Sequence, residues 1–244
     1  MNGKEKISTG IKGLDEMTKG GITRSSVIAI VGPHGSGKTL MSLQFLNACL
    51  AAGKSCMYIS SLHNDKELVE NGAHYGWKFE PFLENKLMLK HIEPVHITQQ
   101  GVELHLISNY LDELPKVVSE TKAEIVIIDT ITDFLMLCKS EIERRSRLMG
   151  LLDILKKNGS TVLITAEAAV ASDMTPSGIV EYITDGVIVL RRVQSQDLSE
   201  VVHIIQIVKL RWAEHSREIR QFDFTNTGIE VYSKYNVMLG WHGR

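Results

Sequence analysis

The sequence of 244 residues has little cysteine, proline, aromatic character or net charge. Its three cysteines, Cys49, Cys56 and Cys138, are odd in number and form no C-x-x-C pair, which argues against a disulfide framework and favours reduced thiols. No Pro/Ser/Gly-rich linker, low-complexity segment or internal repeat divides the chain. The formal net charge of −2 provides no global attraction to nucleic acid or to an anionic membrane, so any basic site has to be local.

Long hydrophobic runs are also absent. No apolar stretch approaches the length that crosses a bilayer, and the amino-terminal sequence MNGKEKISTG lacks the apolar core of a signal peptide. A hydrophobic content of 43% with 23% charged residues is typical of soluble globular proteins. We therefore expect a cytoplasmic protein that makes no contact with a membrane.

What the sequence does contain is a phosphate-binding signature, VIAIVGPHGSGKTL, over residues 27–40. Val27–Val31 is predicted to be a buried strand, and Lys38-Thr39 opens a helix. Between them the glycines follow the G-x-x-x-x-G-K-T spacing of a P-loop (Walker A motif), which directs backbone N–H groups toward a β-phosphate at a helix amino terminus. The expected nucleotide-binding residues are Gly32, Gly35, Ser36, Gly37, Lys38, Thr39 and Leu40.

A second signal for the same chemistry is an apolar strand that ends on an acid. Ala123–Asp129 reads AEIVIID, the arrangement of a Walker B strand, in which the carboxylate lies near Mg²⁺ or its bound water. In a P-loop protein the hydroxyl of Thr39 ligates the same ion. The sequence therefore predicts ATP and Mg²⁺ as cofactors, with Thr39 and Asp129 as the metal-binding residues, partly through water.

Strands and helices alternate over most of the chain. The predicted strands in this part are Val27–Val31, Cys56–Ser60, Leu87–Ile92, Ala123–Asp129 and Thr161–Ala166. The predicted helices are a short one around Ile11, Leu14 and Met17, then Leu40–Ala51, Asp65–Tyr75, Val102–Thr121, broken or kinked at Pro115, and Glu141–Asn158. This alternation is typical of an α/β protein with a mostly parallel central sheet flanked by helices.

Beyond residue 185 the pattern changes to strands with short polar connections: Gly186–Arg192, Val201–Trp212, Arg220–Thr225 and Gly228–Tyr232. Antiparallel strands added to the edge of the parallel sheet explain this change. We expect one α/β domain over residues 1–244.

Several landmarks, in order, resemble the KaiC-like branch of the RecA superfamily of P-loop ATPases, whose members are found in bacteria and archaea. They cover nearly the whole chain: ISTGIKGLDEMTKGGI, the P-loop, AHYGW, IVIIDTITDF, ITAE, EYITDGVIVLRR, KLRWAEH and FDFTNTGIEVY. The resemblance implies a RecA-like fold and a ring, typically a hexamer, with ATP bound between subunits. It also makes Glu167, which ends the ITAE segment, a candidate phosphate sensor.

By the same resemblance, Lys209, Arg211 and His215 reach the γ-phosphate of the neighbouring subunit, as an arginine finger does. The residues alone support a simpler interpretation, in which Lys209 and Arg211 alternate on one face of an edge strand and point to solvent. The family also implies base or sugar contacts from Thr225 and Asn226, where it often has Thr-Asp, and from His74.

The match fails at two places. The family usually has a Glu-Glu pair after the second strand, and one of these glutamates polarises the attacking water; here Leu62-His63 stands there. Leucine cannot accept a proton, whereas His63, with an ordinary pKa near 6.5, is a candidate base. We therefore expect slow or absent hydrolysis. The finger segment is altered as well: Trp212-Ala213-Glu214 replaces Gly-Thr-x.

The sequence thus predicts an ATP-binding, oligomeric, nucleotide-dependent regulator, with a protein partner in signalling as a further candidate interaction. One alternative is a recombinase-like ATPase that binds DNA through Arg144, Arg145 and Arg147 and the loop 168–178. We favour a solvated helix face for these arginines, since no aromatic stacking platform accompanies them and the loop carries no basic residue. The other alternative is an autophosphorylating phosphotransferase.

Overall fold

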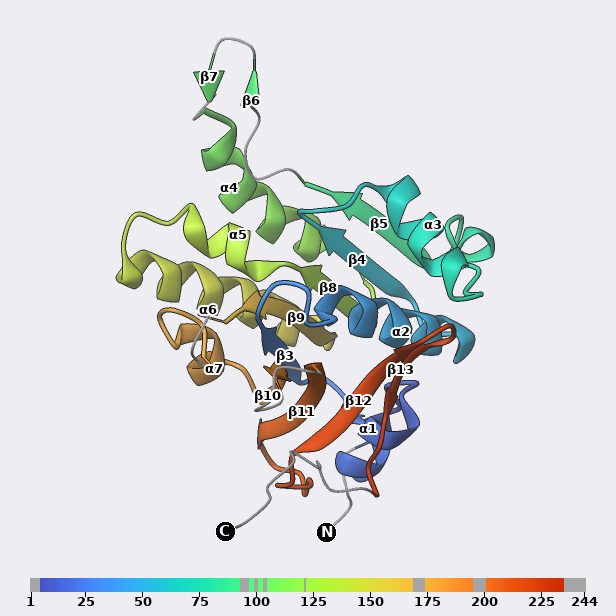
Figure 1. Cartoon of the computed structure of the whole chain (residues 1–244). Coiled ribbons are helices and arrows are strands. Elements are labelled where there is room, and N and C mark those ends of the chain that lie inside the picture. The colour runs from blue at the N-terminus through green and yellow to red at the C-terminus, as the bar shows by residue number, and fades with distance from the viewer. Residues whose placement is uncertain are drawn as a thin grey trace.

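The computed structural model describes residues 5–92, 97–98, 101–102, 105–120, 122–168, 174–194 and 201–234, without the side chains of residues 97–112. Within these residues a nine-stranded sheet has the order β13-β12-β11-β10-β3-β9-β8-β4-β5 (Figure 1). Six strands run parallel: β3 (Val27–Gly32), β4 (Cys56–Ser60), β5 (Leu87–His91), β8 (Ile125–Asp129), β9 (Thr161–Glu167) and β10 (Gly186–Gln194). Three antiparallel strands extend the sheet: β11 (Val201–Leu210), β12 (Arg220–Thr225) and β13 (Gly228–Val231).

Helices cover both faces of this sheet (Figure 1). One face carries α1 (Lys12–Met17), α2 (Lys38–Ala51) and α3 (Asp65–His74), and the other carries α4 (His105–Glu120), α5 (Ile131–Met136), α6 (Glu141–Lys157) and α7 (Ile179–Ile183). Smaller elements are the hairpin of β1 (Lys6–Ile7) with β2 (Ile22–Thr23), the hairpin of β6 (Ile97–Thr98) with β7 (Gly101–Val102), and a 3₁₀ turn, η1 (Glu80–Phe82).

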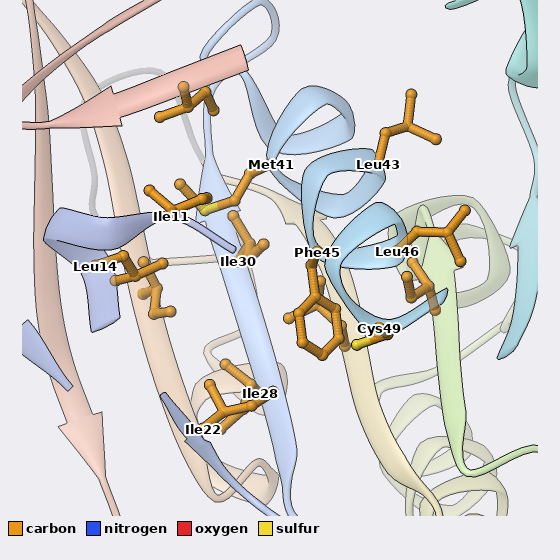
Figure 2. Packing of buried hydrophobic residues seen from close by; sticks show 14 of the residues in the cluster. Ile11, Leu14, Ile22, Ile28, Ile30, Met41, Leu43, Phe45, Leu46 and Cys49 are labelled. Atoms are coloured by element: carbon orange, nitrogen blue, oxygen red, sulfur yellow. The ribbon is translucent and has the colours of Figure 1, made fainter. Parts of the chain in front are cut away.

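The alternation of β3 side chains divides the interior into two cores. Ile28 and Ile30 pack against Phe45 and other residues of α2, as Figure 2 shows, whereas Val27, Ala29 and Val31 pack on the opposite side with α4–α7. A strand buried on both faces needs a continuous apolar run, which is why β3 reads as one. Among the described residues, none of the helices has the length and apolarity needed to span a bilayer.

The predicted α/β architecture is confirmed, and the bounds predicted for β4 and β12 match the structure. The helix predicted over Val102–Thr121 is wrong at its start, because Val102 belongs to β7 and α4 begins at His105. Pro115 does not break α4, whose Leu114 and Val118 are buried in the second core. The short helices α5 and α7 were not predicted, since six and five residues carry too little periodic pattern.

The topology gives the sheet two functionally different edges. At the carboxyl edge of the parallel strands lie the ends of β3, β4, β8 and β9. At the amino edge, Gly186 of β10 pairs with Leu210 of the antiparallel β11, so the chain leaves β11 where β10 begins. Residues that follow β11 therefore lie at the end of the sheet opposite to the P-loop.

Candidate functional site

The P-loop connects β3 to α2 and folds around its own lysine. Gly37 is the residue before α2 and has a left-handed backbone with a φ of 95°. The ammonium of Lys38 is buried and donates hydrogen bonds to the carbonyl oxygens of Gly32 and Pro33, each at 2.9 Å. Burial lowers the pKa of Lys38. The lysine is thus held inside the loop, at the position where a phosphate-binding ammonium is required.

The loop glycines allow close approaches that a side chain would block. A Cβ on Gly32 would lie 2.6 Å from the carbonyl oxygen of Leu190 and from Ser36 Oγ, and one on Gly37 would lie 2.6 Å from the ring of Phe224. The hydroxyl of Ser36 is buried and has no hydrogen-bond partner among the residues that the structure describes. Burying a hydroxyl without a hydrogen-bond partner costs free energy, and a bound ligand that accepts or donates a hydrogen bond there would remove this cost.

Asp129, the last residue of β8, is buried and held from two sides. Tyr58 Oη donates to its Oδ2 at 2.8 Å, and Thr165 Oγ1 donates to its Oδ1 at 2.5 Å. The pKa of Tyr58 is raised by burial and by the Asp129 carboxylate, so Tyr58 remains a proton donor to it. Tyr58 and Thr165 were not predicted as site residues, because the sequence shows them only as parts of buried strands.

A pocket of about 490 Å³ lies over the carboxyl edge of the sheet. Most of the predicted nucleotide and metal residues line it: Gly35, Ser36, Gly37, Lys38, Thr39, Leu40, Asp129, His63, His74 and Glu167. Residues that sequence reasoning missed also line it: His34, Leu43, Asn71, Tyr75, Thr130 and Phe224. His34, Leu43 and Thr130 stand within or beside the two motifs, whereas Asn71, Tyr75 and Phe224 come from elements distant in sequence that no motif spacing indicates.

Leu62 and His63 occupy the pocket wall just after β4. The hydroxyl oxygen of Ser60 accepts the backbone N–H groups of Leu62 at 3.2 Å and His63 at 2.9 Å, which holds the turn in place. The Leu62 side chain lines the pocket and is 54% exposed. His63 Nδ1 lies 3.7 Å from Glu67 Oε2 in the first turn of α3. The carboxylates among the lining residues are Asp129 and Glu167.

The predicted finger residues lie away from this pocket, at the amino edge of the sheet. Lys209 Nζ donates to the carbonyl oxygen of Glu181 at 2.7 Å, and Arg211 Nη2 donates to that of Tyr182 at 3.2 Å. The simpler interpretation holds in part: Arg211, just after β11, is exposed, whereas Lys209 is half-buried. The strand itself lies between β10 and β12, and both cations bind α7 carbonyl groups. His215 Nδ1 lies 3.5 Å from the Ala213 carbonyl oxygen, in the segment after β11.

Two predicted base contacts lie beside the pocket instead of in it. Thr225 Oγ1 donates to the carbonyl oxygen of Gly228 at 2.8 Å, within the turn from β12 to β13, and Asn226 belongs to the same turn. The residue from this turn region that reaches the pocket is Phe224.

The residues present fit a nucleoside triphosphate with a divalent cation. The loop has a glycine cradle, a buried ammonium and an unpartnered hydroxyl, and a hydroxyl and a carboxylate, Thr39 and Asp129, line the same pocket. Oxygen ligands of this kind suit Mg²⁺. Among the described residues no group of three or more His, Cys, Asp and Glu side chains is placed to hold a metal ion.

The fold and the loop define a P-loop ATPase with a RecA-like fold. Comparison with protein families is more specific: the family model described as "ATPase: KaiC" matches residues 7–236. The chain belongs to this KaiC-like family, which confirms the resemblance seen in its motifs and implies ATP binding.

Individual relatives agree. The circadian clock protein KaiC2 of Synechocystis sp. is 30% identical over 238 residues, which cover 96% of this chain and 41% of that protein. The chain thus spans less than half the length of such KaiC relatives. A UPF0273 protein of Thermotoga maritima is 28% identical and is covered over 96% of its length. The crystal structure of a KaiC-like protein from Pyrococcus horikoshii superimposes with a TM-score of 0.78 at 27% identity, covering 94% of this chain and 99% of that one.

Proposed function

We propose that residues 1–244 form one ATP-binding domain that acts as a nucleotide-dependent regulator, assembles into a ring and hydrolyses ATP slowly or not at all. The observation that carries this proposal is the composition of a single pocket. The P-loop residues 35–40 and Asp129 line it together, whereas Leu62-His63 occupies the wall where the family usually has two glutamates.

The chain's own residues divide the work of binding. Backbone N–H groups of residues 35–40 and the Lys38 ammonium hold the phosphates, with Ser36 as a further donor. Thr39 and Asp129 hold Mg²⁺, partly through water, and this ion neutralises phosphate charge when bound. Glu167 senses the phosphates, and His74 with Phe224 forms the wall on the base side.

Slow chemistry follows from the pocket wall. Loss of a general base costs typically 10²–10⁴-fold in rate. His63 is the residual candidate for that role, but its ring lies beside Glu67, which is also tied to the Asn64 N–H in the capping box of α3. An imidazole so close to a carboxylate of α3 also differs from a glutamate in charge and reach, so we expect it to replace the family's acid poorly.

The position of the finger residues supports action between subunits. At about 3.3 Å per residue, the six residues of β3 separate the two edges of the sheet by roughly 20 Å. Lys209, Arg211 and His215 at one edge cannot serve the P-loop of their own chain at the other. A head-to-tail ring, typically a hexamer in the family, brings the amino edge of one subunit to the pocket of the next.

The described contacts of the arginine cluster do not favour the DNA-binding alternative. Arg144 Nε donates to the Leu135 carbonyl oxygen at 3.1 Å, and the Arg145 guanidinium lies 5.0 Å from the centre of the Tyr182 ring. Arg147 Nε lies 3.7 Å from Glu143 Oε1. These interactions are those of a structural helix face. Part of the loop 168–178 lies outside the described residues.

The test is phosphate release from Mg-ATP by wild type and by the Leu62→Glu and His63→Glu variants, with Leu62→Gln and His63→Gln as uncharged controls of equal size. We expect faint turnover in wild type and a gain of 10²-fold or more in at least one Glu variant, without a gain in its Gln control. Robust wild-type turnover would refute the claim about hydrolysis. Failure of wild type to bind ATP would refute the proposal as a whole, and intact-mass measurement after incubation with ATP detects self-phosphorylation.

A further inference from the structure

Trp212 is the most exposed large apolar side chain of the described chain, at 87%. It lies two residues after the end of β11, and its φ of 60° is left-handed, a conformation that bulky residues rarely adopt and glycine adopts freely. Exposing a large aromatic side chain on a strained backbone costs free energy, and backbone strain of this kind is concentrated at functional positions.

The backbone around Trp212 is anchored on both sides. The Arg211 N–H donates to the Asp185 carbonyl oxygen at 2.8 Å, and the Ser216 N–H donates to that of Met17 at 2.7 Å. The Arg211 guanidinium is itself bound to α7. The indole is thus presented by a fixed turn beside the two finger cations. Tryptophan is also the side chain most enriched among the residues that dominate protein interfaces.

A complementary apolar surface lies at the opposite edge of the same molecule. Leu62 is 54% exposed on the pocket wall, and Leu40, which is half-buried, lines the same pocket. The Leu62 backbone is held by Ser60 Oγ, so this contact surface is preformed. Charges are complementary too: Lys209 and Arg211 precede Trp212, whereas the carboxylates of Asp129 and Glu167 line the same pocket as Leu62.

We propose that the indole of Trp212 packs on Leu62 of the neighbouring copy of this chain and covers the ATP pocket of that copy. The inference rests on the proposed head-to-tail assembly and adds to it a specific contact. The two places where the sequence departs from its family then form the two sides of one contact. A large aromatic residue replaces glycine on one side of the boundary, and leucine replaces an acid on the other.

The contact has a chemical consequence. Where a glutamate would hold the attacking water, two apolar side chains meet and exclude it. The pocket is thereby closed with the triphosphate intact, and the subunit boundary is stabilised for as long as ATP is held. The chain would act as a nucleotide-dependent clamp between copies of itself.

The experiment is a double-mutant cycle on the full chain in Mg-ATP, with subunit dissociation followed by analytical ultracentrifugation. The variants are Trp212→Gly, Leu62→Ala and the double variant. Ile142→Ala, which truncates a side chain that is 83% exposed on α6, is the matched control. We expect each single change to weaken assembly roughly 30-fold and the double change to weaken it no further, because residues in contact are not additive.

A second measurement follows the exposure of the Trp212 side chain itself. Iodide quenching of the Trp212 emission, obtained as the difference between wild type and Trp212→Phe, should fall when Mg-ATP is added. Assemblies that hold ATP while Trp212 stays fully quenchable, additive effects of the two substitutions, or an equal loss in Ile142→Ala would overturn the contact and leave the proposed function standing. Absence of ATP binding or of assembly in wild type would overturn the proposed function and this inference with it.

Discussion

At the scale of single residues, the carboxylate of Asp129 is oriented by two hydrogen bonds in a way that suits metal binding. Tyr58 and Thr165 each donate a hydroxyl hydrogen bond to one of its oxygens. An ionised carboxylate has about four lone-pair sites, so these two donors orient the group and leave capacity for an ion or its water. The three residues come from β4, β8 and β9, which are neighbours only because the parallel strands are paired.

Replacing Tyr58 by phenylalanine tests this arrangement. Removing the hydroxyl deletes a hydrogen bond to a charged group, worth about 1.5–3 kcal/mol, and frees the carboxylate to rotate. The Mg²⁺ concentration needed for half-maximal ATP binding should rise several-fold, as measured by titrating Mg²⁺ at fixed ATP. Binding of ATP without Mg²⁺ serves as the internal control and should not change. If both conditions weaken equally, Tyr58 has only a structural role.

At the scale of elements, the P-loop between β3 and α2 is held in place by the packing of these two elements in the core. Its helix packs on Ile28 and Ile30 through Phe45 and its neighbours (Figure 2), so the loop is carried by the most deeply buried part of the fold. The start of α2 is left without a side-chain cap, because Gly37 stands at the capping position. Open N–H groups at this position are what an anion needs.

Gly35 and Gly37 form a matched pair for a test of this loop. Both have positive φ values, 72° and 95°, so alanine is strained at either position by about 1–2 kcal/mol. Only at Gly37 would the added Cβ meet the Phe224 ring, whereas nothing lies within 4 Å of the same atom at Gly35. Gly37→Ala should therefore lower the free energy of unfolding by a further 1–3 kcal/mol, about the cost of overpacking, as measured by urea denaturation. Equal losses would mean that Phe224 moves aside freely.

At the scale of the whole molecule, the sheet separates two halves of one proposed site. The P-loop and Asp129 lie at its carboxyl edge, and Lys209 and Arg211 lie at its amino edge, held by the α7 carbonyl groups. The ammonium of Lys209 is partly buried, and this desolvation lowers its pKa. A site completed by a neighbouring copy makes assembly and ATP binding interdependent.

Mixing two defective variants tests this arrangement. Lys38→Met impairs the loop and keeps the finger, whereas Arg211→Ala impairs the finger and keeps the loop. Neither variant alone should retain ATP tightly, but mixed assemblies contain boundaries with an intact loop and an intact finger. The number of ATP molecules retained per subunit after gel filtration should therefore rise on mixing. A mixture that retains no more ATP than its two components would contradict a site shared between subunits.

The sequence by itself determined the P-loop and the strands, because the residues that form each of them are close together in the chain. The P-loop could be predicted from 14 residues of the chain because its glycines, lysine and threonine act through neighbouring backbone. The continuous apolar runs predicted the parallel strands, and the antiparallel addition followed from the change of pattern after residue 185. Leu62-His63 was recognisable only against the family's motif.

Tertiary structure decided what depends on which strands are neighbours. Strand pairing brings Tyr58 and Thr165 to Asp129, and it places Phe224 against Gly37 from the far end of the chain. It also places Lys209 and Arg211 at the end of the sheet away from their own P-loop, because an antiparallel β11 ends where β10 begins. No spacing in the sequence carries this information, since it is a property of the order of strands in the sheet.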